Sequence, residues 1–245
     1  MREIRLFVDA PMRAGLELAL PEGAARHALR VLRLQPGAAL TLFNGDGLQY
    51  AARLGAVDAR AAMLRIEAAE SVQRESPLRV TLLQAVARGD KMDWIIQKAT
   101  ELGAARILPV TSERGEVRLD GARGEKRLDH WRAISIAACE QCGRNVVPQI
   151  SASESLEACL AAHPRTSAQV RWVLHPGGTA RMRNIEPAAA DVVLAVGPEG
   201  GFSDNDLAAL RQAGFDALAL GPRILRTETA GLAAMAALQA IRGDF

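Results

Sequence analysis

The sequence predicts an α/β protein, with a small β-barrel preceding a larger domain that has a parallel sheet and helices on both of its faces. Up to about residue 73, short strand-like runs alternate with turn signals, whereas strand and helix patterns alternate after Pro77. Hydrophobic residues make up 49% of the 245 residues, which suffices for two cores. We therefore expect one domain at 1–73 and a second at 77–245, joined by the polar segment Gln73–Pro77.

The first domain is predicted to contain four short strands and one helix. The strands are expected at Ile4–Val8, Ala39–Phe43, Tyr50–Val57 and Ala62–Glu67. A strong turn signal, Asn44-Gly45-Asp46-Gly47, separates the second strand from the third. The helix is expected at Glu22–Leu34, where Pro36-Gly37 closes it.

The second domain is predicted from apolar runs that suit buried strands and alternate with helical patterns. The strands are expected at Leu78–Ala87, Arg106–Val110, Val170–Leu174, Val192–Val196 and Ala217–Leu220. The helices are expected at Lys91–Leu102, His130–Gln141, Asp204–Ala213 and Thr227–Ile241. Such alternation is typical of a parallel sheet, which binds ligands at the carboxyl ends of its strands.

Three loops rich in Gly and Pro are the candidate ligand site of this second domain. They are His175–Gly178, Gly197–Gly201 and Gly221–Thr229, and each follows a predicted strand. We expect them to meet at one edge of the sheet, where glycines let a ligand approach the backbone. One such loop alone is more often an ordinary turn. The phosphate-loop and dinucleotide-binding glycine patterns are absent from the sequence, which disfavours a kinase or a dehydrogenase.

The remaining composition indicates a cytoplasmic protein with no membrane segment and no metal site. Charged residues interrupt the N-terminus, and the apolar run Ala230–Leu238 is shorter than the roughly 20 residues that span a bilayer. Cys139 and Cys142 form a C-x-x-C pair, but no second ligand pair completes a zinc site, and Cys159 does not complete one. We expect inert packing thiols.

Five segments of the chain resemble the bacterial 16S rRNA (uracil-N3)-methyltransferase family. They are RHALRVLRLQPG (Arg26–Gly37), RGDKMDWIIQKATELG (Arg88–Gly103), EQCGRNVVP (Glu140–Pro148), VGPEGGFSDND (Val196–Asp206) and LGPRILRTETA (Leu220–Ala230). The family belongs to the SPOUT class, so the resemblance implies a trefoil knot in the second domain and a PUA-like, RNA-binding first domain. It also implies S-adenosylmethionine as cofactor, 16S rRNA within the assembled small subunit as substrate, and a homodimer with the final helix at its interface.

The resemblance places the methyl donor on the three loops, held mainly by main-chain groups and apolar side chains. The residues that it implies for this role are Leu174, His175, Pro176, Val196, Gly197, Pro198, Glu199, Gly200, Leu220, Gly221, Ile224, Leu225, Arg226, Thr229 and Ala230. Glu199 either orders its loop or contacts the substrate. The Ala-rich face of Gly231–Ala240 suits a dimer contact and a buried core helix equally well.

Methylation of uracil N3 requires removal of the ring proton, which places negative charge on O2 and O4. A cation beside those oxygens lowers the barrier, and we expect Arg226 to supply it. Glu228 is the candidate proton acceptor, although it can instead balance charge in the first turn of the last helix. Both roles stay open.

RNA contact must come from local basic patches, because the net charge of the chain is only +2. Arg26, Arg30 and Arg33 fall at i, i+4 and i+7 of the predicted helix and form the leading candidate, although such a stripe is often only a solvated face. The further candidates are Arg5, Arg88, Lys91, Arg114 and Arg144.

Two other functions stay open beside N3 methylation of uridine. A knotted methyltransferase of the same class can act on a ribose 2′-hydroxyl. A non-catalytic RNA-binding or assembly factor can retain the same fold. The intact GPEGG and LRTET segments, in Gly197–Gly201 and Leu225–Thr229, argue against the non-catalytic alternative.

Overall fold

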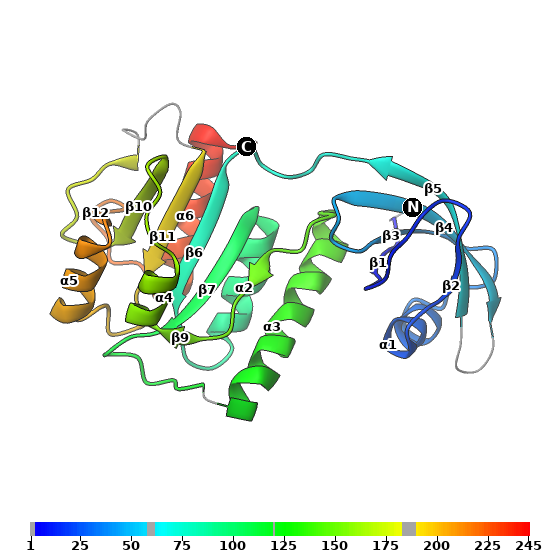
Figure 1. Ribbon diagram of the computed structural model, residues 1–245, viewed down its shortest axis with the longest axis horizontal. Helices are drawn as coiled ribbons and strands as arrows, with labels where there is room; N and C mark the ends of the chain where they lie inside the picture. The colour runs from blue at the N-terminus through cyan, green and yellow to red at the C-terminus, as the bar shows by residue number, and fades with distance from the viewer. Residues whose placement is uncertain (1–2, 58–61, 120, 183–189) are drawn as a thin grey trace. The chain divides into compact units, whose positions relative to one another are not determined.

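A computed structural model describes residues 3–57, 62–119, 121–182 and 190–245 of the chain (Figure 1). It contains two compact units. The first is Met1–Glu75 together with Cys139–Val147, and the second is Ser76–Ala138 together with Pro148–Phe245. The sequence had predicted that Cys139–Val147 would belong to the second domain. In the described part of the chain, no helix has the length and apolar character needed to cross a membrane.

The first unit is built on a five-stranded sheet. In their order across the sheet, the strands are β1 (Arg5–Phe7), β3 (Ala39–Phe43), β4 (Leu48–Val57), β5 (Ala62–Ser71) and β2 (Glu17–Ala19). β1 pairs parallel to β3, and the other neighbours pair antiparallel. The four predicted strands are present, whereas β2 was missed because three residues are too few to show a period.

The helix of the first unit differs from its prediction. Helix α1 spans Glu22–Arg26 and continues as a π-helix, η1, over His27–Val31, so the element ends before the predicted Leu34. Arg33 already has a positive φ of 53°. A π-helix closes i→i+5 hydrogen bonds, so residues four and seven apart no longer share one face. Arg26, Arg30 and Arg33 therefore do not form the regular α-helical stripe that was expected.

The second unit is built on a parallel sheet with the strand order β12-β10-β11-β6-β7-β8. Its strands are β6 (Arg79–Ala85), β7 (Ala104–Thr111), β8 (Gln149–Ile150), β9 (Glu154–Ser155, paired with β7), β10 (Gln169–Leu174), β11 (Asp191–Val196) and β12 (Asp216–Leu218). Its helices are α2 (Lys91–Glu101), α3 (Gly121–Cys142, of which the last four residues belong to the first unit), α4 (Leu156–Ala162), α5 (Asp204–Gln212) and α6 (Thr227–Arg242). Every predicted strand and helix is present, whereas β8, β9 and α4 were not predicted.

Alternating side chains of the central strands supply two separate cores, one on each face of the sheet. Leu82 of β6 and Leu194 of β11 belong to the core that contains Ile95 of α2 and Leu238 of α6. The neighbouring residues Leu83 and Val193 join the core on the other face, which contains Leu156 of α4 and Leu210 of α5. Helices thus cover both faces (Figure 1). The predicted α/β class is confirmed, and the trefoil knot stays a prediction.

Candidate active site

A cavity of about 520 Å³ lies in the second unit, where β10 and β11 end and α6 begins. All three predicted loops contribute to it. It is lined by Lys91, Arg114, Leu174–Pro176, Val196–Phe202, Ile224–Glu228 and Ala230. The volume falls in the range of about 300–1,000 Å³ that is usual for small-molecule sites. The prediction that the three loops meet at one edge of the sheet is confirmed.

Most of the residues predicted to bind the donor line this cavity. Leu220 and Gly221 instead line a smaller hollow that shares Leu174 and Ile224 with the cavity. Thr229 is exposed and lines neither space. The structure adds Lys91, which was predicted only as an RNA contact, to the group around the second loop.

The second loop is folded tightly on itself, and glycine is required for this. The Gly201 N–H donates to the carbonyl of Pro198 at 2.9 Å, which closes a turn. A Cβ on Gly197 would lie only 3.0 Å from the backbone nitrogen of Phe202, and Gly201 has a positive φ of 69°. The loop ends at the N-cap of α5, where Ser203 and Asp206 form a reciprocal capping box.

A buried chain of hydrogen bonds joins three elements beneath the cavity. The Thr227 hydroxyl donates to the carbonyl oxygen of Gly197 at 2.6 Å and accepts from Gln84 Nε2 at 3.0 Å. Gln84 is fully buried near the end of β6. The start of α6 is thereby fixed to β6 and to the second loop. Sequence reasoning missed both side chains, although a glutamine inside the apolar run Leu78–Ala87 was a signal that could have found one of them.

Lys91 lies between two carboxylates at the edge of the cavity. Its Nζ is 2.8 Å from Glu199 Oε1 and 3.8 Å from Glu228 Oε2. Glu199 Oε1 also accepts a hydrogen bond from the backbone N–H of Arg88 at 3.1 Å. Burial of the Glu199 carboxyl opposes its ionisation, but these hydrogen bonds outweigh burial and lower its pKa. Glu199 is therefore held as an anion that orders its loop.

Glu228 and Arg226 are bound less tightly by the protein than Glu199 is. Glu228 Oε2 is buried and has no hydrogen-bond partner within the described residues, apart from its ion pair with Lys91. The side chain of Arg226 is exposed, and its carbonyl accepts hydrogen bonds from the N–H groups of Thr229 and Ala230 at the start of α6. Ile224, which lines the cavity, is 83% exposed. Arg226 and Ile224 are therefore exposed to a ligand, whereas Glu228 is only partly exposed.

Comparisons with known proteins show which family this chain resembles. A family model described as an RNA methyltransferase domain matches residues 74–239, and one described as an RNA methyltransferase PUA domain matches residues 20–67. The ribosomal RNA small subunit methyltransferase E of Mycobacterium tuberculosis is 35% identical, over 95% of this chain and 89% of that protein. The chain belongs to this methyltransferase family.

Two solved structures of similar proteins cover the whole of this chain and were determined with S-adenosylmethionine. The ribosomal RNA small subunit methyltransferase E of Neisseria gonorrhoeae is 38% identical, with both chains covered completely and a TM-score of 0.92. A putative methyltransferase of Legionella pneumophila is also 38% identical over 100% of both chains, with a TM-score of 0.94. The predicted family resemblance is confirmed.

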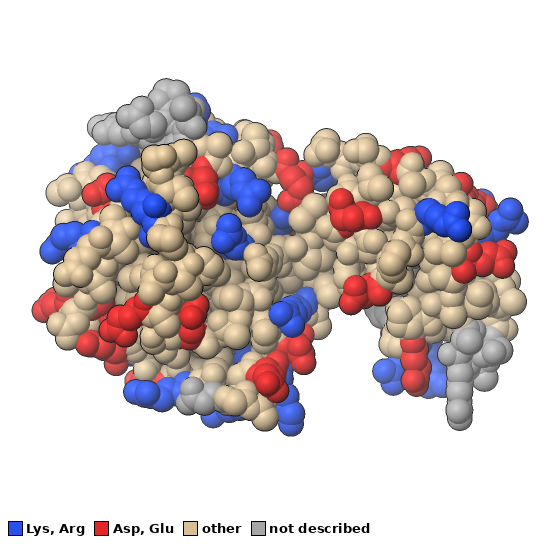
Figure 2. All heavy atoms as spheres, viewed as in Figure 1, with Lys and Arg blue, Asp and Glu red and all other residues tan. Residues whose placement is uncertain are grey.

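In this member of the methyltransferase E family, six of the eight predicted RNA contacts are on the surface or at the cavity. Arg26, Arg30, Arg33 and Arg88 are exposed, and Arg88 forms an ion pair with Glu116. Arg114 donates to the carbonyls of Gly200 and Phe202, so it supports the second loop. On the face shown in Figure 2, basic and acidic side chains are interspersed.

Two predicted RNA contacts, Arg5 and Arg144, are buried in the first unit and require correction. They are 6% and 4% exposed. Arg5 Nη2 donates to the side chain of Asn145 and its guanidinium lies over the ring of Phe43, while Arg144 pairs with Glu75. Burial disfavours the charged form and lowers the pKa of Arg5. Enclosed guanidinium groups do not reach a phosphate, so we assign both arginines a structural role.

The C-x-x-C pair, Cys139 and Cys142, lies at the end of α3. Cys139 is buried, and its thiol donates to the carbonyl of Val146 at 3.6 Å. Burial raises the pKa of Cys139 to about 12, which makes a reactive thiolate unfavourable at neutral pH. Burial, followed by the nearby Glu154 carboxylate, also raises the pKa of Cys159 to about 12.

Proposed function

We propose that this chain transfers the methyl group of S-adenosylmethionine to N3 of a uridine in small-subunit (16S) ribosomal RNA. The observation that carries the proposal is the cavity in which three strand-end loops meet beside Lys91, Arg226 and Glu228. Comparison with other proteins also supports the proposal. The chain is similar over nearly its full length to small-subunit methyltransferases, and the structure of one of these was determined with the same donor.

The composition of the cavity suits this donor. Leu174, Val196, Phe202 and Leu225 offer apolar surface, while the glycines of the second loop leave backbone groups accessible to a nucleoside. Carboxylates at the edge of the cavity suit the positive charge of a sulfonium. When bound, the donor supplies a methyl group activated for attack by a nitrogen lone pair.

We propose different roles for the two carboxylates of the site. Glu199 is held by Lys91 and by a backbone N–H, so it is already engaged. Glu228 lines the cavity and is 3.8 Å from Lys91, and we assign its carboxylate the role of accepting the N3 proton of uracil. The ammonium of Lys91 lies 3.8 Å from Glu228 Oε2, at the edge of the same cavity.

The exposed guanidinium of Arg226 balances the charge that this proton transfer creates. Loss of the proton from N3 places negative charge on O2 and O4 of the uracil. Arg226 lies next to Thr227 and Glu228 at the cavity and has no ion-pair partner in the described ranges, so its charge is available to those oxygens. Positioning of the base against the donor supplies the rest of the rate enhancement.

The proposal extends to partners of the enzyme. The first unit, with exposed Arg26, Arg30 and Arg33, is proposed to hold the RNA, and its residues 20–67 match the PUA-domain model. The assembled small subunit is the proposed form of the substrate. A homodimer through α6 is supported by Ile241 and Phe245, which are 45% and 67% exposed at the C-terminal end of the chain. Sedimentation of the purified protein tests the dimer.

Nucleoside mass spectrometry tests the reaction itself. Small subunits from cells that lack this activity are incubated with the protein and S-adenosylmethionine, and the 16S rRNA is then digested to nucleosides. We expect 3-methyluridine to appear. A 2′-O-methylated nucleoside in its place would show the alternative ribose chemistry, and no methylated product together with intact donor binding would contradict the proposed reaction.

A further inference from the structure

Three residues with metal-binding side chains converge on the α4 side of the sheet, outside the active-site cavity. Glu154 lies in β9, Cys159 in α4, and His163 is the C-cap residue of α4. One candidate ligand atom from each, a carboxylate oxygen, the thiol sulfur and a ring nitrogen, lies within 4.8 Å of the other two. Nothing in the proposed methyl transfer uses these residues.

Local structure explains why these side chains meet. Cys159 and His163 are four residues apart, so they lie one above the other on a single face of the helix. The same i, i+4 spacing presents paired ligands to zinc in helical metal sites. Glu154 precedes the helix and is fixed by the pairing of β9 with β7. The set therefore comes from a short stretch of chain with a defined conformation.

We propose that Glu154, Cys159 and His163 form a binding site for a zinc ion. A thiolate and an imidazole together favour zinc over magnesium or calcium, and a carboxylate is an accepted third ligand. Ligands bound at about 2.0–2.3 Å from a tetrahedral zinc lie roughly 3.5 Å apart. The 4.8 Å cluster must therefore contract by about 1 Å, which rotation of the Glu154 and His163 side chains can supply.

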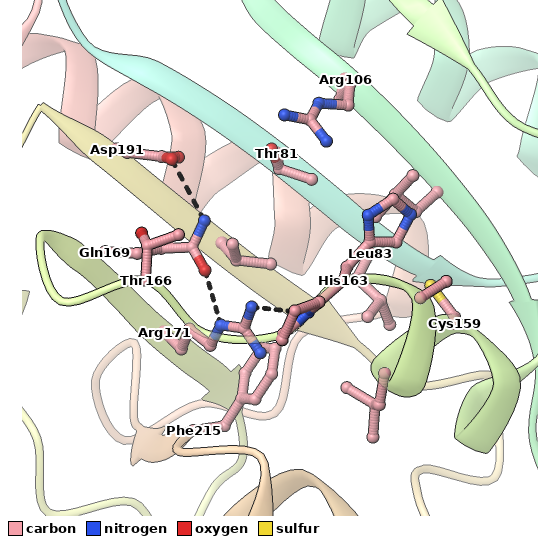
Figure 3. Close-up of a pocket in the computed structure, with 15 residues that line it drawn as sticks. Thr81, Leu83, Arg106, Cys159, His163, Thr166, Gln169, Arg171, Asp191 and Phe215 are labelled. Carbon is pink, nitrogen blue, oxygen red and sulfur yellow. Dashed lines mark hydrogen bonds between the residues drawn. The ribbon is translucent and has the colours of Figure 1, made fainter.

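Three protein ligands leave the fourth position of a tetrahedral ion open. Cys159 and His163 also line a cavity of about 300 Å³, so water can reach that position from the cavity (Figure 3). Binding replaces the thiol proton of Cys159 by the metal. The S–H bond breaks, a sulfur–zinc bond forms, and the proton passes to solvent. No redox partner is needed.

The bound ion would tie both ends of α4 to the sheet. Glu154 anchors the ion to β9 and thus to β7, while His163 anchors it to the far end of the helix. α4 has only seven residues, so it gains little stability from its own hydrogen bonds. The bound ion would therefore stabilise this short helix and the loop that follows it.

Cobalt titration of the full chain tests the site. The protein is reduced, stripped of metal with EDTA and desalted, and Co²⁺ is then added as a spectroscopic substitute for zinc. We expect an equimolar amount to produce thiolate-to-cobalt charge-transfer absorption and the visible bands of a tetrahedral ion. Added Zn²⁺ should abolish both signals. Absence of the charge-transfer band at a several-fold excess of Co²⁺ would overturn the proposal.

Variants decide which thiol binds the metal. Cys159→Ser should abolish the charge-transfer band, whereas Cys139→Ser and Cys142→Ser, which remove the other two cysteines, should retain it. Persistence of the band in Cys159→Ser overturns the proposal. His163→Gln keeps the thiol and tests the site even if Cys159→Ser does not fold. We expect it to weaken cobalt binding about tenfold or more, since a lost ligand bond exceeds about 1.4 kcal/mol. An unchanged affinity would contradict the proposal.

Discussion

Lys91 is the residue that lies between the two carboxylates of the candidate active site. The sequence pointed to it only as a surface cation at the head of a helix. In the structure its ammonium contacts Glu199 of the second loop and faces Glu228 of α6. Its burial is partial, and it belongs to a cavity formed by segments far apart in the sequence. Helix periodicity places Lys91 on α2, but it does not show which carboxylates lie opposite.

Replacing Lys91 by Met should impair methyl transfer. We expect kcat/KM to fall roughly 10- to 100-fold, because a hydrogen bond to a charged group contributes about 1.5–3 kcal/mol. Lys98→Met is the matched control. Lys98 lies on the same helix with a similar exposed fraction, 30% against 32% for Lys91, and contacts Glu101 and Trp94 of that helix instead of the cavity. Equal effects of the two substitutions on kcat/KM would remove Lys91 from the site.

Tyr50 provides a spectroscopic test in the first unit, because it is the single tyrosine of the chain. Burial, followed by its 2.6 Å hydrogen bond to Asp46, raises the pKa of Tyr50 to about 12. The folded pKa lies above the unfolded value of about 10, so the stability contributed is complete below pH 10 and is lost as the pH approaches 12.

Absorbance titration of tyrosinate should therefore give a midpoint near pH 12 in the folded protein and near 10 in denaturant. Asp46→Asn should lower the folded midpoint but leave it above 10, since burial of the ring remains. A midpoint near 10 in the folded wild-type protein would show that the phenol is neither buried nor hydrogen-bonded as described.

At the scale of elements, strands and helices with a strong hydrophobic pattern were predicted from the sequence, whereas short elements were missed. The buried strands β6, β10 and β11 were found because continuous apolar runs ended at glycine- or proline-containing loops. β8, β9 and α4 have two, two and seven residues, too few for a pattern to emerge. The π-helix at His27–Val31 was missed because no residue there marks a change from i→i+4 to i→i+5 bonding.

The start of α6 is the element boundary that most directly positions the site. Thr227 joins it to the carbonyl of Gly197 and to Gln84. The near-isosteric substitution Thr227→Val removes the hydroxyl group. The Gly197 carbonyl and the buried Gln84 side chain then each lose the hydrogen bond that they form with it. We expect the free energy of unfolding to fall by about 1–3 kcal/mol, and the donor affinity to fall with it. Urea denaturation and calorimetric titration measure the two effects.

Thr229→Val is the control for this substitution. Thr229 is exposed two residues further along α6 and lines no part of the cavity. We expect it to change the free energy of unfolding by less than about 0.5 kcal/mol. A Thr227→Val protein as stable as wild type, with unchanged donor affinity, would show that the buried hydrogen bonds do not hold the site together.

At the scale of the whole molecule, composition identified a globular protein but not an RNA-binding one. The net charge of +2 gives no strong signal, and RNA recognition was expected from local patches only. The structure removed Arg5 and Arg144 from those patches by burying them. A sequence cannot separate such arginines from exposed ones, because both kinds occur next to apolar residues.

Charge reversal of Arg26, Arg30 and Arg33 together should weaken binding of 16S rRNA. It should also reduce the slope of log Kd against log salt concentration by about 2 to 3, since each lost phosphate contact removes roughly 0.7–0.9. Filter binding at several salt concentrations measures both quantities. Reversal of Arg165, Arg181 and Arg211, which are exposed in the second unit, is the control. If the first triple variant matches wild type in both quantities, these arginines do not contact RNA.

The most direct test of the account follows a labelled methyl group from S-adenosylmethionine into 16S rRNA, with wild-type protein and with Arg226→Ala. We expect the wild type to place the label on uridine N3, and Arg226→Ala to lose at least about 100-fold in turnover while it still binds the donor. Arg223→Ala, in the same exposed loop, should retain turnover. Wild-type turnover in Arg226→Ala would remove Arg226 from the mechanism, and wild-type protein that leaves no label on uridine N3 would contradict the proposed reaction.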